Sequence, residues 1–152
     1  MAKFGPDNAH FKKHLPNLRH VYTRLTPFQR MAIANQRMDR LDSPANELIA
    51  VVSAVEGLAR SLVVGERVDR GEQFEIAYEA VRNRDPVQLV KEIAALAHVT
   101  PAKLVASADG WRLFRWACAY RNLLIHEATM LNENDAFWLI QSTRQVFRMI
   151  SP

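Results

Sequence analysis

The sequence predicts an all-α protein: a helical bundle of four to five main helices, preceded by an irregular and basic N-terminal arm. Apolar residues recur at spacings of three and four, which is the period of one helix face. No stretch shows a sustained alternation of apolar and polar residues, and no Asn-Gly or Asp-Gly turn joins two such stretches. At 152 residues, 49% of them hydrophobic, the chain has the length and composition of one domain that buries a core without disulfides.

Residues 1–27 are the predicted arm, and residues 28–152 are the predicted bundle. Three prolines and little apolar periodicity indicate an irregular segment. Residues 1–40 carry 8 Lys/Arg against 2 Asp/Glu, whereas residues 41–152 carry 12 against 14, so the basic character belongs to the N-terminal quarter. With its histidines and aromatic residues, this segment could contact a phosphate backbone and stack on bases. Alternatively, it is a solvated arm that packs on the acidic body.

Start signals mark the helices of the bundle in order. Thr26-Pro27 predicts a first helix, and Ser43-Pro44 predicts a long core helix over about 44–64, because proline fits the first helical turn. A short amphipathic helix from Phe74 should stop before Asp85-Pro86. Three further segments follow the same logic: a helix over 87–97, a short helix after Thr100-Pro101, and a long helix over about 110–130 that Asp109 could cap. Residues 132–135 interrupt the pattern before a final helix.

The composition predicts a soluble, cytoplasmic protein that does not associate with a membrane. No secretory signal opens the chain, and the longest aliphatic runs, such as Leu48 to Val52, are too short to cross a bilayer. The single cysteine, Cys118, is interpreted as a small buried residue in a reducing compartment, with a catalytic thiol as the alternative.

The candidate chemistry lies in the long helix predicted over 110–130, in the run from Arg121 to His126. Arginine stays charged and can bind phosphoryl oxygens in pairs, while histidine can move a proton near neutral pH. Asn122 could orient either group or bind a phosphate oxygen. The three residues therefore suit a phosphodiester site in which His126 is general acid or base and Arg121 offsets phosphoryl charge. No familiar metal-ligand spacing is present, so no metal or other cofactor is expected.

Helical geometry does not by itself unite these side chains. Asn122 and His126 are four residues apart and share a face, whereas Arg121 and His126 diverge by about 140°. A local bend or a second subunit would have to complete the site. If neither does, Arg121 is an ordinary surface or interface arginine and His126 a histidine satisfied between core positions.

Four residues are possible supporting members of the site. Glu56 and Arg60 could face it from the core helix, or form an exposed intrahelical ion pair. Glu127 could modulate His126 or be solvated. Tyr120 could stack on a base or pack in the core.

The arrangement of Arg121, Asn122 and His126 in a later helix of a small helical protein resembles the HEPN superfamily. The resemblance covers about residues 40–150, and its specific part is the Arg-polar-x-x-x-His motif. It implies a bundle of four or five helices, often a homodimer, that cleaves single-stranded RNA without a metal, as a toxin or phage-defence component with RNA and an antitoxin protein as partners. The alternative is a non-enzymatic helical module that binds RNA, nucleotide or a protein partner. A third interpretation treats the motif as coincidence.

Overall fold

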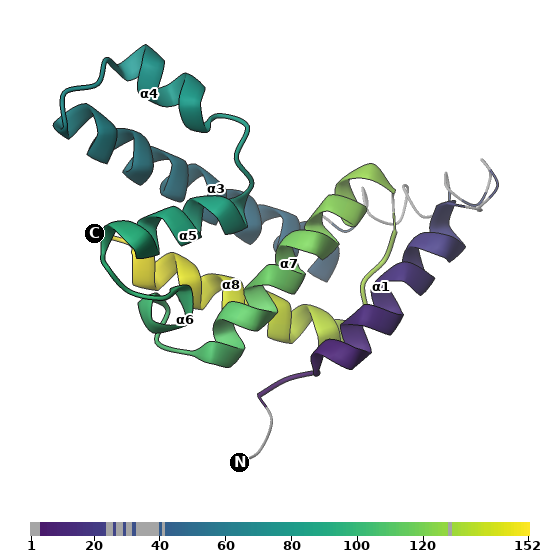
Figure 1. Cartoon of the computed structure of the whole chain (residues 1–152). Coiled ribbons are helices and arrows are strands. Elements are labelled where there is room, and N and C mark those ends of the chain that lie inside the picture. The colour runs from purple at the N-terminus through teal and green to yellow at the C-terminus, as the bar shows by residue number, and fades with distance from the viewer. Residues whose placement is uncertain are drawn as a thin grey trace.

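The computed structural model describes residues 4–23, 26, 29, 32, 40, 42–127 and 129–152. Within these residues the secondary structure is entirely helical, so the predicted fold class is confirmed (Figure 1). The expected helix after Thr26-Pro27 falls largely outside the described residues. The described helices are α1 (Asn8–Thr23), α3 (Pro44–Asp69), α4 (Phe74–Val81), α5 (Pro86–Leu96), α6 (Pro101–Leu104), α7 (Ala108–His126) and α8 (Glu133–Ile150).

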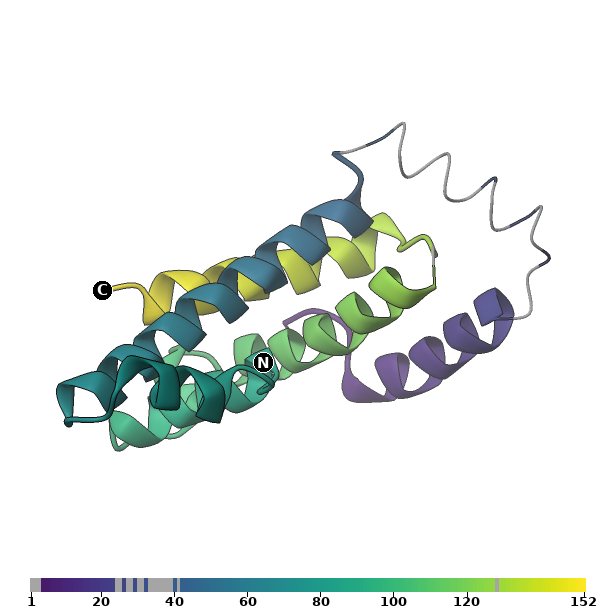
Figure 2. The same ribbon diagram turned by 90° about the horizontal axis from the view of Figure 1, so that it is seen from above.

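Helix α3 is the centre of the bundle. Ser43 caps its start by accepting a hydrogen bond from the backbone N–H of Asn46, and Pro44 occupies the first turn. The helix continues past Gly65, where the expected helix stopped, and ends before Gly71, whose φ of +100° favours glycine. It packs against α4, α5, α7 and α8, which explains why its inward face is apolar (Figure 2).

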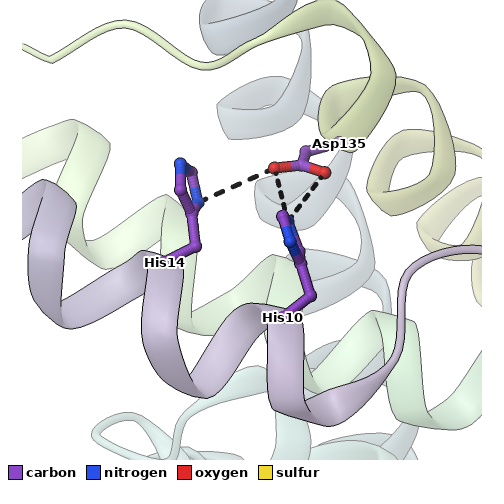
Figure 3. Close-up of side chains that lie close together, drawn as sticks. All are labelled: His10, His14 and Asp135. Carbon is purple, nitrogen blue, oxygen red and sulfur yellow. Dashed lines mark hydrogen bonds and ion pairs between the residues drawn. The ribbon is translucent and has the colours of Figure 1, made fainter.

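Helix α1 corrects the expectation of an irregular arm. Residues 8–23 are helical with Pro16 inside the helix, and both Phe11 and Leu15 are buried. Phe11, Leu15 and the partly buried Leu18 follow one another at spacings of four and three, so they form a narrow apolar stripe. This stripe packs α1 along α7, while His10 and His14 point toward Asp135 of α8 (Figures 1 and 3). The prolines concealed this short apolar pattern.

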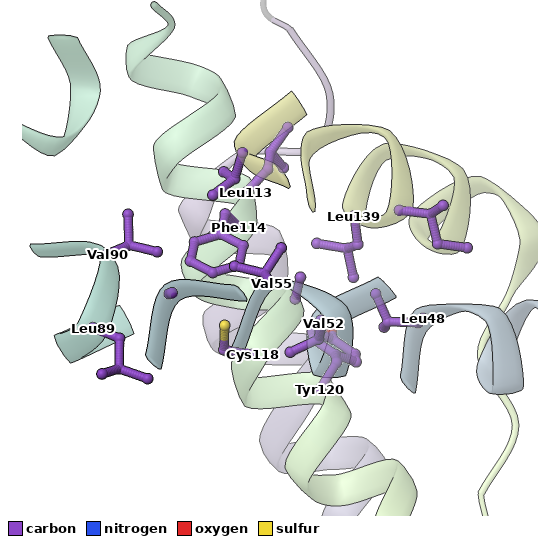
Figure 4. Packing of buried hydrophobic residues seen from close by; sticks show 14 of the residues in the cluster. Leu48, Val52, Val55, Leu89, Val90, Leu113, Phe114, Cys118, Tyr120 and Leu139 are labelled. Atoms are coloured by element: carbon purple, nitrogen blue, oxygen red, sulfur yellow. The ribbon is translucent and has the colours of Figure 1, made fainter. Parts of the chain in front are cut away.

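Helices α7 and α8 form the other two sides of the core. Ser107 caps α7 and Asn132 caps α8, each by accepting a hydrogen bond from a backbone N–H in the first turn. The expected start of α7 near residue 110 is close, although Ser107 rather than Asp109 is the cap, and the helix ends at His126 instead of near residue 130. Side chains from α3, α5, α7 and α8 fill the interior between them (Figure 4).

The remaining short helices pack at the edge of the bundle, α4 and α5 against α3, and α6 against α5 and α7. Helix α5 begins with a complete capping box, in which Asp85 and Gln88 each accept a hydrogen bond from the other's backbone N–H. Helix α6 begins at Pro101, and the side chain of the N-cap residue Thr100 accepts a hydrogen bond from the backbone N–H of Lys103, as the Thr100-Pro101 signal predicts. These caps place the start of α5 beside α7, where the candidate motif lies.

By length and composition alone, α3 is apolar enough to cross a membrane. The sequence-based expectation considered only uninterrupted aliphatic runs, whereas the whole helix is 26 residues long. The central helix of a bundle meets the same criteria, and α3 buries seven of its residues against its neighbours. About a third of its most apolar window is buried inside the bundle (33%), so its place in the core accounts for part of its apolar character.

Candidate functional site

Helix α7 carries the whole motif, and its geometry divides the motif between two faces. At 100° per residue, Arg121 lies about 100° from Asn122 and about 140° from His126 around the helix axis. Arg121 faces α3, whereas Asn122 and His126 are both exposed. The structure therefore does not bring the three side chains together within one chain.

Arg121 belongs to a cluster of three charged side chains, which we call the glutamate cluster: Glu56, Arg60 and Arg121. Nη2 of Arg121 donates to Oε2 of Glu56 at 2.7 Å, and Nη2 of Arg60 donates to Oε1 of the same carboxylate at 2.7 Å. The side chains of Arg121, Arg60 and Glu56 are 14%, 19% and 22% exposed, so the pairs are shielded from solvent more than surface ion pairs are. Glu56 and Arg60 form the intrahelical ion pair of one sequence interpretation, although it is shielded rather than exposed, and Glu56 also contacts Arg121.

The environment of Glu56 keeps it charged. Burial raises the pKa of this carboxyl, but the hydrogen bonds and positive charges of Arg60 and Arg121 together outweigh burial, so that its pKa is lowered from the ordinary value of 4.5. One carboxylate balances two guanidinium groups. The cluster therefore retains one net positive charge at neutral pH, next to the exposed face of α7.

Asn122 lies on a different surface, beside a polar hollow of about 620 Å³ between α1, α7 and the start of α5. Its cationic lining residues are Lys12, Arg112 and Arg115, and its one carboxylate is Asp85. Trp116 adds an indole ring to the wall. Neither Arg121 nor His126 lines this hollow.

Arg112, which lines this hollow, also holds the segment before α1 in place. Its guanidinium donates to the backbone carbonyls of Pro6 at 2.6 Å and Phe4 at 3.2 Å, which fastens the segment before α1 to α7. Arg115 is exposed and, among the described residues, makes no ion pair or hydrogen bond through its side chain. Arg115, Asn122 and His126 fall within about 40° on the α7 surface, so they form one polar stripe.

Tyr120 is not available for base stacking, because it is completely buried (Figure 4). Its ring packs against Phe11, and its hydroxyl is 2.6 Å from Nδ1 of His14. Burial, with a smaller contribution from the charge of Asp135, raises the pKa of Tyr120 above its usual value, so the phenol stays protonated at neutral pH. The packing interpretation is the one that fits this residue.

Glu127 is the C-cap residue of α7, and its backbone N–H donates to the carbonyl of Leu123.

Burial also explains why the thiol of Cys118 has a raised pKa. The thiol is buried in α7, and desolvation raises its pKa to about 12. A thiol that stays protonated is a poor nucleophile, which supports the packing interpretation over the catalytic one.

The sequence analysis missed a second polar cluster, which we call the histidine cluster: His10, His14 and Asp135. Nε2 of His10 lies 3.1 and 3.0 Å from the two oxygens of Asp135, and Nδ1 of His14 lies 3.7 Å from Oδ2 (Figure 3). The signal that could have revealed half of it is the spacing of four between the two histidines, which places them on one helix face. Asp135 is 125 residues away from His10, so only the fold brings it there.

The chain matches no protein-family model, no curated protein and no solved structure.

Proposed function

We propose that this protein is a HEPN-like, metal-independent endoribonuclease that cleaves single-stranded RNA as a homodimer. The observation that carries the proposal is the placement of the motif residues on two adjacent sides of α7. The glutamate cluster fixes Arg121 on one side of the helix end, and Asn122 and His126 are exposed on the adjacent side. A phosphodiester site needs both a fixed cation and an accessible proton carrier.

In this proposal, a second copy of the chain completes the catalytic site. Because Arg121 and His126 diverge on α7, the two residues serve one phosphate when the motif helices of two protomers face each other. Arg121 would then offset charge on the phosphoryl oxygens, while His126 moves the proton of the attacking or leaving ribose oxygen. Attack by the 2′ oxygen on its own phosphate leaves a cyclic phosphate end and releases a 5′ hydroxyl. Asn122 orients the phosphate between them.

The hollow beside Asn122 supports RNA as the substrate. Lys12 and Arg115 are exposed cations at its edge, and Trp116 offers part of a ring surface. Such groups bind a phosphate backbone and stack on unpaired bases without reading sequence. The strand would run from this hollow along the α7 stripe toward His126. Toxin or phage-defence activity, held in check by an antitoxin protein, is the role that we propose on the HEPN resemblance.

The test is cleavage of end-labelled single-stranded RNA by purified protein in EDTA, with the product ends identified by mass. We expect a cyclic phosphate end. We expect His126→Ala to slow cleavage by about 100-fold or more, since general acid–base catalysis contributes that much. Arg121→Lys keeps the charge but loses the paired donors, so we also expect it to slow cleavage.

His98→Asn is the matched control, because His98 is exposed, lies far from the motif in the sequence and has a φ of 57° that asparagine tolerates. An unchanged rate in His126→Ala would overturn the catalytic assignment. Circular dichroism of each variant shows whether the helical content is retained.

A non-enzymatic RNA-binding module is the second candidate. One specific observation favours it: Arg121 already donates to Glu56, and no contact in the described part of the chain joins Arg121 to His126. This candidate predicts saturable RNA binding without cleavage, and an affinity that falls steeply with salt. Lys12→Ala with Arg115→Ala should reduce the salt slope by about two. Deleting α1 would be a poor test, since it uncovers the surface that Phe11 covers.

A further inference from the structure

We propose that His10, His14 and Asp135 form a zinc-binding site that links α1 to α8. The proposal does not depend on the ribonuclease activity, because it involves a different set of side chains. It begins with α1, which presents two imidazoles one helical turn apart. Their rings are nearly parallel, with centroids 5.3 Å apart, and both face Asp135 (Figure 3).

The carboxylate of Asp135 is oriented before any ion binds. Asn132 donates from Nδ2 to Oδ2 of Asp135 at 2.8 Å, and its own Oδ1 accepts the backbone N–H of Asp135 at 2.8 Å. Outer contacts of this kind fix the direction of a metal ligand and are a regular part of metal sites. The side chain of Asp135 is only 3% exposed, so its carboxylate needs polar partners, and the two imidazoles meet it together with Asn132.

The candidate ligand atoms are close enough to share one ion. One nitrogen from each histidine and one oxygen from Asp135 all lie within 4.8 Å of one another. Ligand bonds of 2.0 to 2.2 Å separate the donor atoms of a tetrahedral zinc site by about 3 to 4 Å. Small side-chain rotations would therefore close the site without moving either helix.

The type of ligand selects the ion. Two imidazoles with one carboxylate favour zinc and similar transition metals, whereas magnesium and calcium prefer oxygen ligands alone. The side chains of His10 and His14 are 41% and 30% exposed, so an ion can enter from solvent and water can fill the fourth position. This arrangement of three protein ligands plus one open position is known from zinc enzymes.

Tyr120 provides an internal control. Its hydroxyl is hydrogen-bonded to Nδ1 of His14 at 2.6 Å, and a bound ion would replace that hydrogen bond. A phenylalanine at this position leaves the three ligands intact and removes the competing hydroxyl. Tyr120→Phe should therefore bind zinc at least as tightly as the unmodified protein.

The experiment uses the full chain without an affinity tag, stripped with EDTA and dialysed. Zinc is titrated by calorimetry, and Co²⁺ is used as a spectroscopic probe. We expect one ion per chain, visible absorption bands of tetrahedral or five-coordinate Co²⁺, and a raised melting temperature with zinc, because an ion that binds only the folded state stabilises it. Thiolate charge-transfer bands should be absent, since Cys118 is not a ligand.

The ligand variant is His10→Gln, chosen because His10 is the most exposed of the three residues and its replacement should not disturb folding. It should weaken zinc binding at least about 100-fold, since even outer contacts of metal ligands are worth 10-fold to 100-fold. His98→Asn, which removes an exposed histidine elsewhere, should bind zinc normally. The proposal is overturned if the protein shows no saturable zinc binding, or if His10→Gln binds zinc as tightly as the unmodified chain.

Discussion

Tyr120 and Arg121 are neighbours in α7, yet they point into two polar clusters of different chemistry. Arg121 joins the glutamate cluster with α3, and Tyr120 reaches the histidine cluster formed by α1 and α8. The glutamate cluster is built from guanidinium groups that do not lose their charge, so it is a fixed feature of the bundle. The histidine cluster is built from two imidazoles on one carboxylate, the ligand types of the zinc site that we propose. One helix thus contacts two polar clusters of different composition through residues that lie about 100° apart around its axis.

Helix α1 and the core helices also differ in how they are attached to the rest of the bundle. Helix α1 makes few contacts with the bundle and uses Phe11 and Leu15 beneath its histidines, whereas α3 and α7 share a large apolar interface in addition to the glutamate cluster. Attachment of α1 should therefore depend on a few residues. Four changes test this contrast, ordered from the largest expected effect to the smallest.

The largest effect is expected for Phe11→Ala. Phe11 is completely buried and contacts Trp116 and Tyr120, so its removal leaves a cavity under α1. We expect a loss of about 3 kcal/mol in the free energy of unfolding, measured by urea denaturation. Hydrogen exchange should show that protection falls first in α1. Val21→Ala, at an exposed position of the same helix, should change little; equal losses in both variants would contradict the proposed anchoring.

A smaller loss, about 2 kcal/mol, is expected for Glu56→Ala. The change leaves Arg60 and Arg121 shielded from solvent without their shared carboxylate, which places its cost between those of exposed and buried ion pairs. Urea denaturation at pH 7 measures it. Glu66→Ala breaks the exposed pair with Arg70 at the same spacing of four and serves as the control. The two clusters would not differ in kind if both variants lost the same small amount.

Tyr120→Phe should cost about 1 kcal/mol in the absence of metal. It removes one partly buried hydrogen bond, to Nδ1 of His14, and keeps the ring that packs on Phe11. Thermal unfolding with EDTA present measures the loss. Tyr78→Phe, at an exposed position on α4, is the matched control. A stability equal to that of the unmodified protein would show that the hydroxyl does not help to hold α1.

The smallest effect is the pH dependence of the glutamate cluster. Since the pKa of folded Glu56 is lowered from 4.5, its contribution is fully present above about pH 4.5 and is lost as the pH falls through the lower value of the folded protein. The stability difference between the unmodified protein and Glu56→Gln should therefore shrink below pH 4.5. Denaturation of both proteins from pH 7 to pH 3 measures it. A difference that grows toward acid pH would reverse the assigned direction.

Much of the fold could be predicted because its signals are local. Pro44 and Pro101 begin helices as their dipeptides predict, and the apolar periodicity located α4 and α8. Helix α1 is hard to predict because its apolar stripe is only three residues long and the helix contains Pro16. The break expected at Gly65 is absent: the helix continues through this glycine, with open space around the position. Intrinsic helix propensity does not decide the structure at such positions, because packing against neighbouring helices stabilises the helix.

The sequence by itself determined the helical class, the caps at Ser43 and Thr100, and the presence of Arg121, Asn122 and His126 on one helix, because these depend on residues within a few turns of each other. Only the tertiary structure decided that Arg121 turns to Glu56, and that Asp135 meets His10 and His14. These partners are 65 and more residues apart along the chain, and no local pattern encodes which helices pack together. Their meeting follows from burial of the apolar faces of α1, α3, α7 and α8, which fixes the rotation of each helix and so the direction of each polar side chain.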